Sequence, residues 1–164
     1  MSLLEMIALI LSAGDSSRLN RDLVQRRQIA FNAYAAANAL GERYASLFQM
    51  GGAPRHPHTA EELEKEFTGH LERLKTEPVG EAELRRALNQ AEAGLYNGLD
   101  RNIILAMRIL GNSQVFHDVD AEFRRVEQLK TVTAAEIMAA AKKYFVETNR
   151  TVGVLRRKSV GGEK

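Results

Sequence analysis

The sequence predicts an α+β domain in which an antiparallel sheet is covered by helices. Side chains in residues 28–37 and 43–51 alternate between two faces, as in strands, and a turn containing Gly41 separates the two segments. Most of the remaining chain has the apolar spacing of helices, and residues 150–155 have the composition of a final strand. This order of helices, hairpin, helices and strand favours the α+β class.

The first expected helix covers residues 3–13, and Glu5 is its only charged residue. A helix that is apolar on every side must be buried on more than one side. Gly14 suits the left-handed position after a helix, and Asp15 or Ser16 can cap the next helix. The same turn could bind an anion through its backbone N–H groups. It lacks the Gly-Lys-Ser/Thr ending of a phosphate loop, so we interpret it as a cap.

A second, amphipathic helix follows this turn. Leu19 and Leu23 give it one apolar face. Five polar residues are expected on the opposite, solvated side: Arg18, Arg21, Asp22, Gln25 and Arg26. The strand that comes next has small side chains, which indicates that a helix packs closely on at least one of its faces.

Two Thr-x-x-Glu capping boxes, at residues 59–62 and 133–136, mark the starts of later helices. The helix that begins at the Thr59 box has an apolar stripe, and His70 is expected on its opposite, solvated side. This stripe consists of Leu63, Phe67, Leu71 and Leu74. The helix that begins at the Thr133 box is expected to end near Phe145.

Three further helices are expected between the two boxes. The first follows the break at residues 78–80 and ends or kinks at residues 97–98. Its inward residues are Leu84, Leu88, Ala91, Leu95 and Leu99. Gly111 is expected to close the next helix, and residues 112–119 to form a loop. Asp120 can cap the last of these three helices. Its inward residues are Phe123, Val126 and Leu129.

The composition is that of an ordinary globular chain, with 164 residues of which 45% are hydrophobic and 27% charged. No apolar run reaches the roughly 18 residues of a membrane span, and a net charge of +2 is too small to indicate nucleic-acid binding. The absence of cysteine excludes disulfides and thiolate sites. Residues 1–11 lack a basic leader, so no signal peptide is expected. Both the bacterial cytoplasm and the periplasm are compatible with these features.

Several short motifs occur in a defined order along nearly the whole chain. They are Gly-x-Ser-Ser-Arg-Leu at residues 14–19, Glu-x-Glu-Leu at 81–84, Val-Thr-x-x-Glu-Ile at 132–137, Lys-Tyr at 143–144 and Arg-Thr-Val at 150–152. Together with the hairpin, this order resembles the C-terminal, non-catalytic domain of the M16 (pitrilysin/insulinase/mitochondrial processing peptidase-like) zinc metallopeptidase family.

The resemblance covers residues 4–157 and implies a LuxS/MPP-like domain without its first two strands. Residues 158–164 are then a disordered basic tail. A sheet that begins at its third strand exposes an unpaired edge. We therefore expect the isolated fragment to self-associate.

The family's catalytic motif, His-x-x-Glu-His, is absent from this sequence. His56 and His58 flank a proline, and His117 is isolated, whereas a zinc site needs at least three positioned protein ligands. We expect no catalytic residue, metal or cofactor in this chain, and no peptidase activity from the chain alone. The resemblance implies that an N-terminal catalytic M16 domain, or a partner M16 chain, holds the zinc and cleaves the peptide substrate.

Family members often supply an Arg and a Tyr, seven residues apart, that contact the substrate backbone near the zinc. The matching positions here are Val24 and Phe31. Neither side chain can donate a hydrogen bond to a carbonyl group. The substrate-binding residues therefore stay unknown, and we expect Phe31 to be at least partly buried.

Two alternatives stay open beside a peptidase half. One is an M16-like structural subunit with no peptidase activity, as in the core proteins of respiratory complexes. The other is an unrelated helical interaction domain. A His-x-x-Glu-His motif elsewhere in the parent protein would separate the peptidase from the structural subunit.

Overall fold

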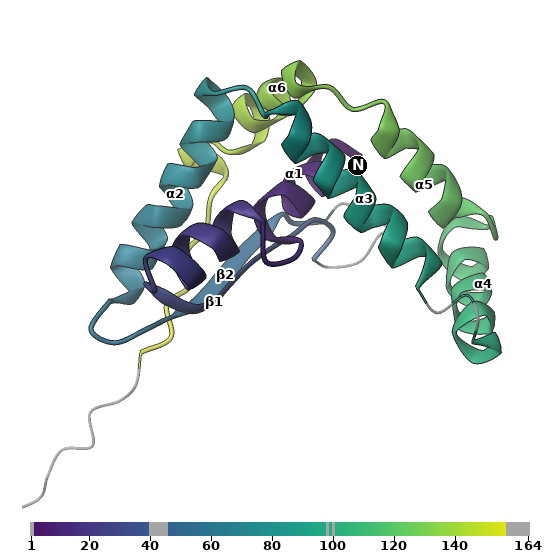
Figure 1. The fold of residues 1–164 in the computed structure, drawn as a ribbon, viewed down its shortest axis with the longest axis horizontal. Coiled ribbons are helices and arrows are strands. Elements are labelled where there is room, and N and C mark those ends of the chain that lie inside the picture. Colours follow the sequence, from purple (N-terminus) through teal and green to yellow (C-terminus); the bar gives the residue numbers. More distant parts are fainter. Residues whose placement is uncertain (1, 40–45, 98, 100, 157–164) are drawn as a thin grey trace, which may run out of the picture.

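The structure, a computed structural model, describes residues 2–39, 46–97, 99 and 101–156. The elements are α1 (Ser2–Ser12), η1 (Asn20–Arg26), β1 (Ala30–Ala36), β2 (Gln49–Pro54), α2 (Ala60–Thr76), α3 (Glu81–Tyr96), α4 (Asn102–Phe116), α5 (Ala121–Lys130), α6 (Ala134–Tyr144) and η2 (Glu147–Asn149). The predicted α+β class is confirmed (Figure 1). The tail at residues 158–164, which we expected to be disordered, lies outside the described residues.

The sheet consists of the hairpin β1–β2, and its strands are antiparallel as predicted. The pairing runs from Ala36 opposite Gln49 to Ala30 opposite Pro54. The first strand lies inside the predicted range 28–37. The order of helix, hairpin and helices along the chain is therefore as the sequence indicated.

The second strand lies later in the chain than predicted. It begins at Gln49, and part of the predicted range 43–51 lies outside the described residues. Gly51, the last residue of the predicted range, and Gly52 both lie inside the strand, which continues to Pro54. A Cβ at Gly51 would stand 2.6 Å from the hydroxyl oxygen of Tyr34. The glycines therefore make room for β1 instead of breaking the strand.

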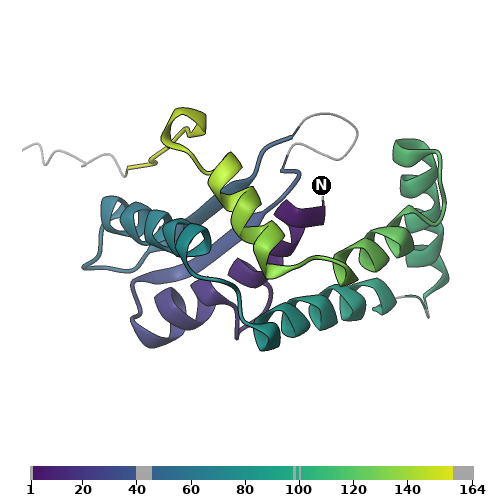
Figure 2. The same ribbon diagram turned by 90° about the horizontal axis from the view of Figure 1, so that it is seen from above.

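The apolar first helix is the centre of the core. α1 contacts β1, α3, α5 and α6, and α2 contacts β2 and α6. Figures 1 and 2 show α1 between the hairpin and these covering helices. The largest fully buried side chains are Met6, Ile7, Leu11, Leu19, Leu23, Leu74, Leu129 and Ile137. The prediction that residues 3–13 form a helix buried on the sheet is confirmed.

The turn after α1 follows the prediction only in part. Gly14 has the expected left-handed backbone, with φ 75°. The next helical residue is Arg18, so Ser17 directly precedes the helix, and no side chain caps η1. Asp15 and Ser16 therefore do not have the predicted capping role.

Both predicted capping boxes are present. The backbone N–H of Glu62 donates to Thr59 Oγ1 at 3.2 Å, and the Thr59 N–H donates to the Glu62 carboxylate at 3.1 Å. Thr133 and Glu136 make the same reciprocal pair at the start of α6. Asp120 precedes α5, as predicted, but its side chain makes no capping bond.

α4 lies at one end of the molecule, and its course differs from the prediction (Figure 2). Gly111 lies inside the helix, which continues to Phe116, so the loop predicted at residues 112–119 is present only at residues 117–119. A glycine costs only about 1 kcal/mol inside a helix, which does not by itself end one. His117 ends α4 in a left-handed conformation. Exposed apolar residues of α4 and α5 include Ile103, Met107, Leu110 and Phe123, the last of which we expected inside.

The final strand predicted at residues 150–155 is wrong. The segment is not paired with a strand, and Figure 1 shows it in yellow beside α2. Arg150 pairs with Glu64 and Arg156 pairs with Glu61, so side chains of α2 hold the segment at both ends. A strand needs backbone partners, and among the described residues only β1 and β2 supply them to each other.

Candidate functional site

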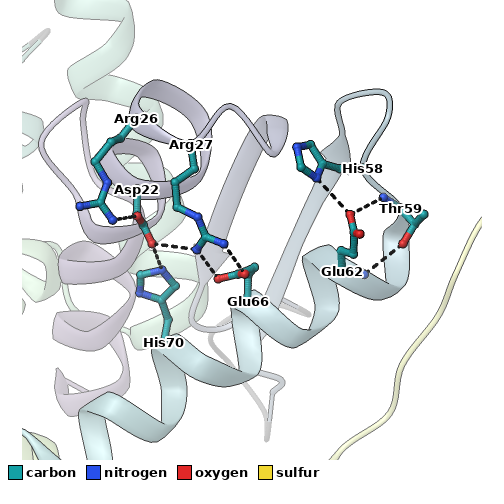
Figure 3. Close-up of polar contacts among 8 residues, drawn as sticks. All are labelled: Asp22, Arg26, Arg27, His58, Thr59, Glu62, Glu66 and His70. Carbon is teal, nitrogen blue, oxygen red and sulfur yellow. Dashed lines mark hydrogen bonds and ion pairs between the residues drawn. The ribbon is translucent and has the colours of Figure 1, made fainter.

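An ionic cluster joins η1 to α2, and Asp22 is at its centre (Figure 3). Asp22 is 8% exposed, contrary to the prediction of a solvated position. Its carboxylate stands 3.2 Å from Nε2 of His70 and 2.6 Å from Nη2 of Arg26. These partners make the burial of this carboxylate possible.

His70 is also buried, with 2% of its surface exposed, so its predicted solvated position is wrong. Its Nδ1 has no hydrogen-bond partner. Burial lowers the pKa of His70, the charge of Arg73 lowers it further, and the carboxylate of Asp22 opposes the shift. A neutral His70 therefore donates its Nε2 hydrogen to Asp22.

The carboxylate of Asp22 stays ionised in this environment. Burial acts to raise its pKa, but the hydrogen bond from Arg26 and the charges of Arg26 and Arg27 hold the pKa below its usual range. Arg27 also donates two hydrogen bonds of 2.6 Å to Glu66 of α2. The cluster thus fixes the end of η1 against α2.

A second ion pair fixes the start of the same helix. The side chain of Arg18, expected in solvent, is 13% exposed and donates to Glu83 of α3. The hydrogen bond from Arg18 holds the pKa of Glu83 below its usual range, although burial acts in the other direction. Sequence spacing could not reveal this pair because its partners are 65 positions apart.

The chain between η1 and β1 has an irregular backbone. η1 itself is a π-helix, and Gln28 has a left-handed φ of 52°. β1 then has one extra residue between Ala30 and Asn32, so Phe31 occupies a β-bulge. The Asn32 side chain accepts a 2.8 Å hydrogen bond from the backbone N–H of Ala53. Such irregularities are concentrated at functional sites, where they direct side chains.

The bulge directs Phe31 outward, where 60% of the residue is exposed, so the prediction of partial burial is wrong. The guanidinium carbon of Arg55 lies 5.0 Å from the centre of the Phe31 ring. Arg55 Nη1 also donates a 3.0 Å hydrogen bond to Oε1 of Gln28. We call Gln28, Phe31 and Arg55 the Arg55 corner. Sequence reasoning missed Arg55 and Gln28 because a contact between two loops carries no spacing signal.

The two predicted site positions have different surroundings. Val24 is half-buried and packs against the core, whereas Phe31 is exposed beneath Arg55. They do not form a polar pair, because neither side chain can donate a hydrogen bond. A cation is nevertheless present at this end of the hairpin, since Arg55 lies over Phe31.

The histidines do not fit a zinc site. His58 pairs with Glu62, His70 is enclosed with Asp22, and His117 ends α4. Across residues 2–39, 46–97, 99 and 101–156, no three His, Asp or Glu side chains are grouped to hold a metal ion. Separately, none of the helices in the described part of the chain has the length and apolarity needed to cross a membrane.

The family profile described as the peptidase M16 inactive domain matches residues 2–91. This is more than half of the chain. The chain belongs to the peptidase M16 inactive domain family. The resemblance inferred from the short motifs is thereby confirmed.

Relatives of this M16 inactive domain include the zinc protease PqqE of Helicobacter pylori, which is 26% identical over 153 residues. That match covers 93% of this chain and 34% of PqqE. The structure is similar to that of a protease from Helicobacter pylori, with a TM-score of 0.79 and 24% identity, over 90% of this chain and 35% of that one. This chain therefore spans about a third of the length of these two relatives.

Two Bordetella structures have the same fold as this M16 inactive domain. One is a proposed zinc protease of Bordetella pertussis Tohama I, with a TM-score of 0.72 and 22% identity over 92% of this chain and 81% of that one. The other is the inactive peptidase domain of a proposed zinc protease of Bordetella parapertussis. Its TM-score is 0.75 and its identity 20%, over 93% of this chain and 81% of that one.

Proposed function

We propose that this M16 inactive domain is the non-catalytic C-terminal half of a zinc-dependent peptidase and forms part of the wall of its substrate chamber. The catalytic half, either an N-terminal M16 domain or a partner M16 chain, holds the zinc and cleaves the peptide. Membership of the M16 inactive domain family is the observation that carries this proposal. The relatives described as zinc proteases, one of which is about three times as long as the matched region, support it.

Within this proposal, residues 4–157 act as one domain and contribute shape and packing instead of chemistry. His58 and His70 each face a carboxylate, and the described residues include no group of three metal-binding side chains, so the proposal assigns the zinc to the partner half. The two ion-paired ends of η1 hold that helix against α2 and α3. A rigid η1 fixes the direction in which the following strand presents Phe31.

The end of the hairpin around Val24 and Phe31 is the part of the surface that we propose faces the peptide. The irregular backbone at Gln28 and Phe31 and the exposed aromatic ring support this assignment. Val24 and Phe31 themselves offer no hydrogen-bond donor, so orientation of the peptide backbone falls to other groups.

The proposal is tested by combining this chain with an M16 catalytic half that carries His-x-x-Glu-His from the same organism. We expect hydrolysis of a fluorogenic peptide only when both halves are present, with zinc bound to the catalytic half. The matched control is a catalytic half in which the motif Glu is replaced by Gln. That variant should assemble equally well but leave the peptide intact.

A structural M16-like subunit is the second candidate, because the polar pair expected at Val24 and Phe31 is absent. Stable assembly without hydrolysis, with partners that all lack His-x-x-Glu-His, would favour that candidate over the peptidase half.

A further inference from the structure

Arg55 differs in its surroundings from two other arginines that lie near η1. The partly buried Arg18 and the exposed Arg27 each face a carboxylate at 2.6 Å. Arg55 is partly buried, yet no ion pair with a carboxylate is found for it within the described residues. Its Nε is buried and has no hydrogen-bond partner. The rest of the guanidinium keeps part of its surface exposed, so an external carboxylate can supply the anionic partner that Arg55 lacks.

The position of Arg55 is nevertheless well defined. Its backbone N–H donates to the carbonyl of Ile29 at 2.7 Å, its Nη1 donates to Gln28, and its guanidinium lies over the Phe31 ring. These contacts orient the guanidinium without neutralising its charge. An oriented planar guanidinium with free donors favours a carboxylate, which it can bind with two parallel hydrogen bonds.

The neighbouring cations are already compensated. Arg26 pairs with Asp22, and Arg27 pairs with Glu66 and Asp22. Of these three arginines, Arg55 is the one for which no carboxylate partner is found. The Phe31 ring, 60% exposed, offers an apolar surface directly beside it.

Building on the function proposed above, we propose that the Arg55 corner is a specificity site for peptides that carry a carboxylate next to an apolar residue. The carboxylate accepts hydrogen bonds from Arg55, and the apolar side chain packs on the exposed part of Phe31. The carboxylate comes either from an acidic side chain or from a free peptide C-terminus, and the two sources offer the same chemistry.

The test is a titration of the ¹⁵N-labelled full chain with three short peptides, followed by NMR. They are acetyl-Ala-Leu-Glu-Ala-amide, acetyl-Ala-Leu-Gln-Ala-amide, and acetyl-Ala-Leu-Gln-Ala with a free carboxyl terminus. We expect at least one carboxylate peptide to shift the Arg55 Nε–H and Phe31 signals and to bind about fivefold to tenfold more tightly than the amidated Gln peptide. The stronger of the two identifies the source of the carboxylate.

Arg55→Gln should abolish the preference for the carboxylate. Arg55→Lys, which keeps the charge but loses the planar fork, should retain only part of it. Arg21→Gln is the matched control, because it removes an exposed arginine of η1 outside the corner and should leave the preference unchanged. The ¹⁵N spectrum of each variant verifies that it is folded.

Equal binding of all three peptides, no binding of any, or a preference that survives Arg55→Gln would overturn the proposal. This readout needs no zinc and no catalytic half, so it is independent of proteolysis. If the assembled halves cleave peptides but Arg55→Gln has no effect on binding, the specificity site is wrong and the peptidase function stands. If Arg55 binds carboxylates but the assembly is inactive, the peptidase function is wrong.

Discussion

Arg18 and Glu83 face each other in a two-point ion pair, with Nε–Oε1 at 2.6 Å and Nη2–Oε2 at 2.8 Å. The pair joins the Gly-x-Ser-Ser-Arg-Leu turn to the Glu-x-Glu-Leu start of α3. Two motifs that the sequence presents separately are therefore the two halves of one contact. Its side chains are only 13% and 19% exposed, so solvent screens the pair little.

We expect Glu83→Gln to lower the free energy of unfolding by about 2–3 kcal/mol, because it leaves a largely buried arginine without its counter-ion. Urea denaturation measures the change. Arg85→Gln is the control, since the Arg85–Glu81 pair is exposed and its loss should cost less than about 0.5 kcal/mol. Equal effects of the two substitutions would contradict the structural role of Arg18 and Glu83.

Stability should fall as the pH drops below about 6.5, the usual pKa of histidine. The pKa of His70 is lowered in the folded state, so the unfolded chain binds a proton first and gains stability relative to the fold. The pKa of Asp22 is lowered too, and its contribution is present above its unfolded value and is lost at still lower pH.

His70→Gln should reduce this pH dependence between pH 7 and pH 5 while an amide donor toward Asp22 is kept. His117→Gln, an exposed position, is the control and should leave the dependence unchanged. Denaturation series at several pH values measure both variants. An unchanged slope in His70→Gln would mean that another group accounts for the loss of stability.

Val24→Arg combined with Phe31→Tyr restores the polar pair common in the family, and we expect it to change stability by less than about 1 kcal/mol. Phe31 is exposed, so the added hydroxyl reaches water, and an arginine at the half-buried Val24 can extend its charged end to solvent. Thermal or urea unfolding tests this. A loss of several kcal/mol would indicate that η1 or the bulge is packed differently.

The two strand glycines should respond differently to substitution by alanine. A Cβ at Gly52 would stand 2.5 Å from the backbone carbonyl of Asn32, so Gly52→Ala must open the hairpin and should cost about 2–3 kcal/mol. Gly51→Ala meets the side chain of Tyr34, which can rotate away more easily than a backbone carbonyl, and should cost less. Gly69→Ala meets nothing within 4 Å inside α2 and should stabilise by about 0.5–1 kcal/mol. A reversed order of the first two would contradict the β1–β2 register.

Self-association of the isolated chain stays a prediction, and α4 is the surface that we expect to carry it. Met107 and Leu110 are each 68% exposed on a helix whose only charged residue is Arg108. Met107→Lys with Leu110→Glu should lower the average mass measured by light scattering, because it puts charges into an apolar face. A monodisperse monomer of the unsubstituted chain at high concentration would contradict the prediction.

Local spacing along the chain was enough to predict several elements. The apolar run of α1, the capping boxes at Thr59 and Thr133, and the alternation in β1 each involve residues a few positions apart. Local hydrogen bonds and side-chain periodicity decide such elements, so they can be read along the chain. The family resemblance came from the same short motifs, because they too are local.

Which polar residues are buried, and where the strands end, depends on contacts between segments that are distant in the sequence. Asp22 and His70 are 48 positions apart, and each is buried because the other is present to satisfy it. Residues 150–155 have strand composition, but a strand also needs a neighbouring backbone, and side-chain pairing to α2 holds them instead. A buried charge and a paired strand both need a partner that folding brings close. The spacing of residues within one segment does not indicate which distant residue that partner is.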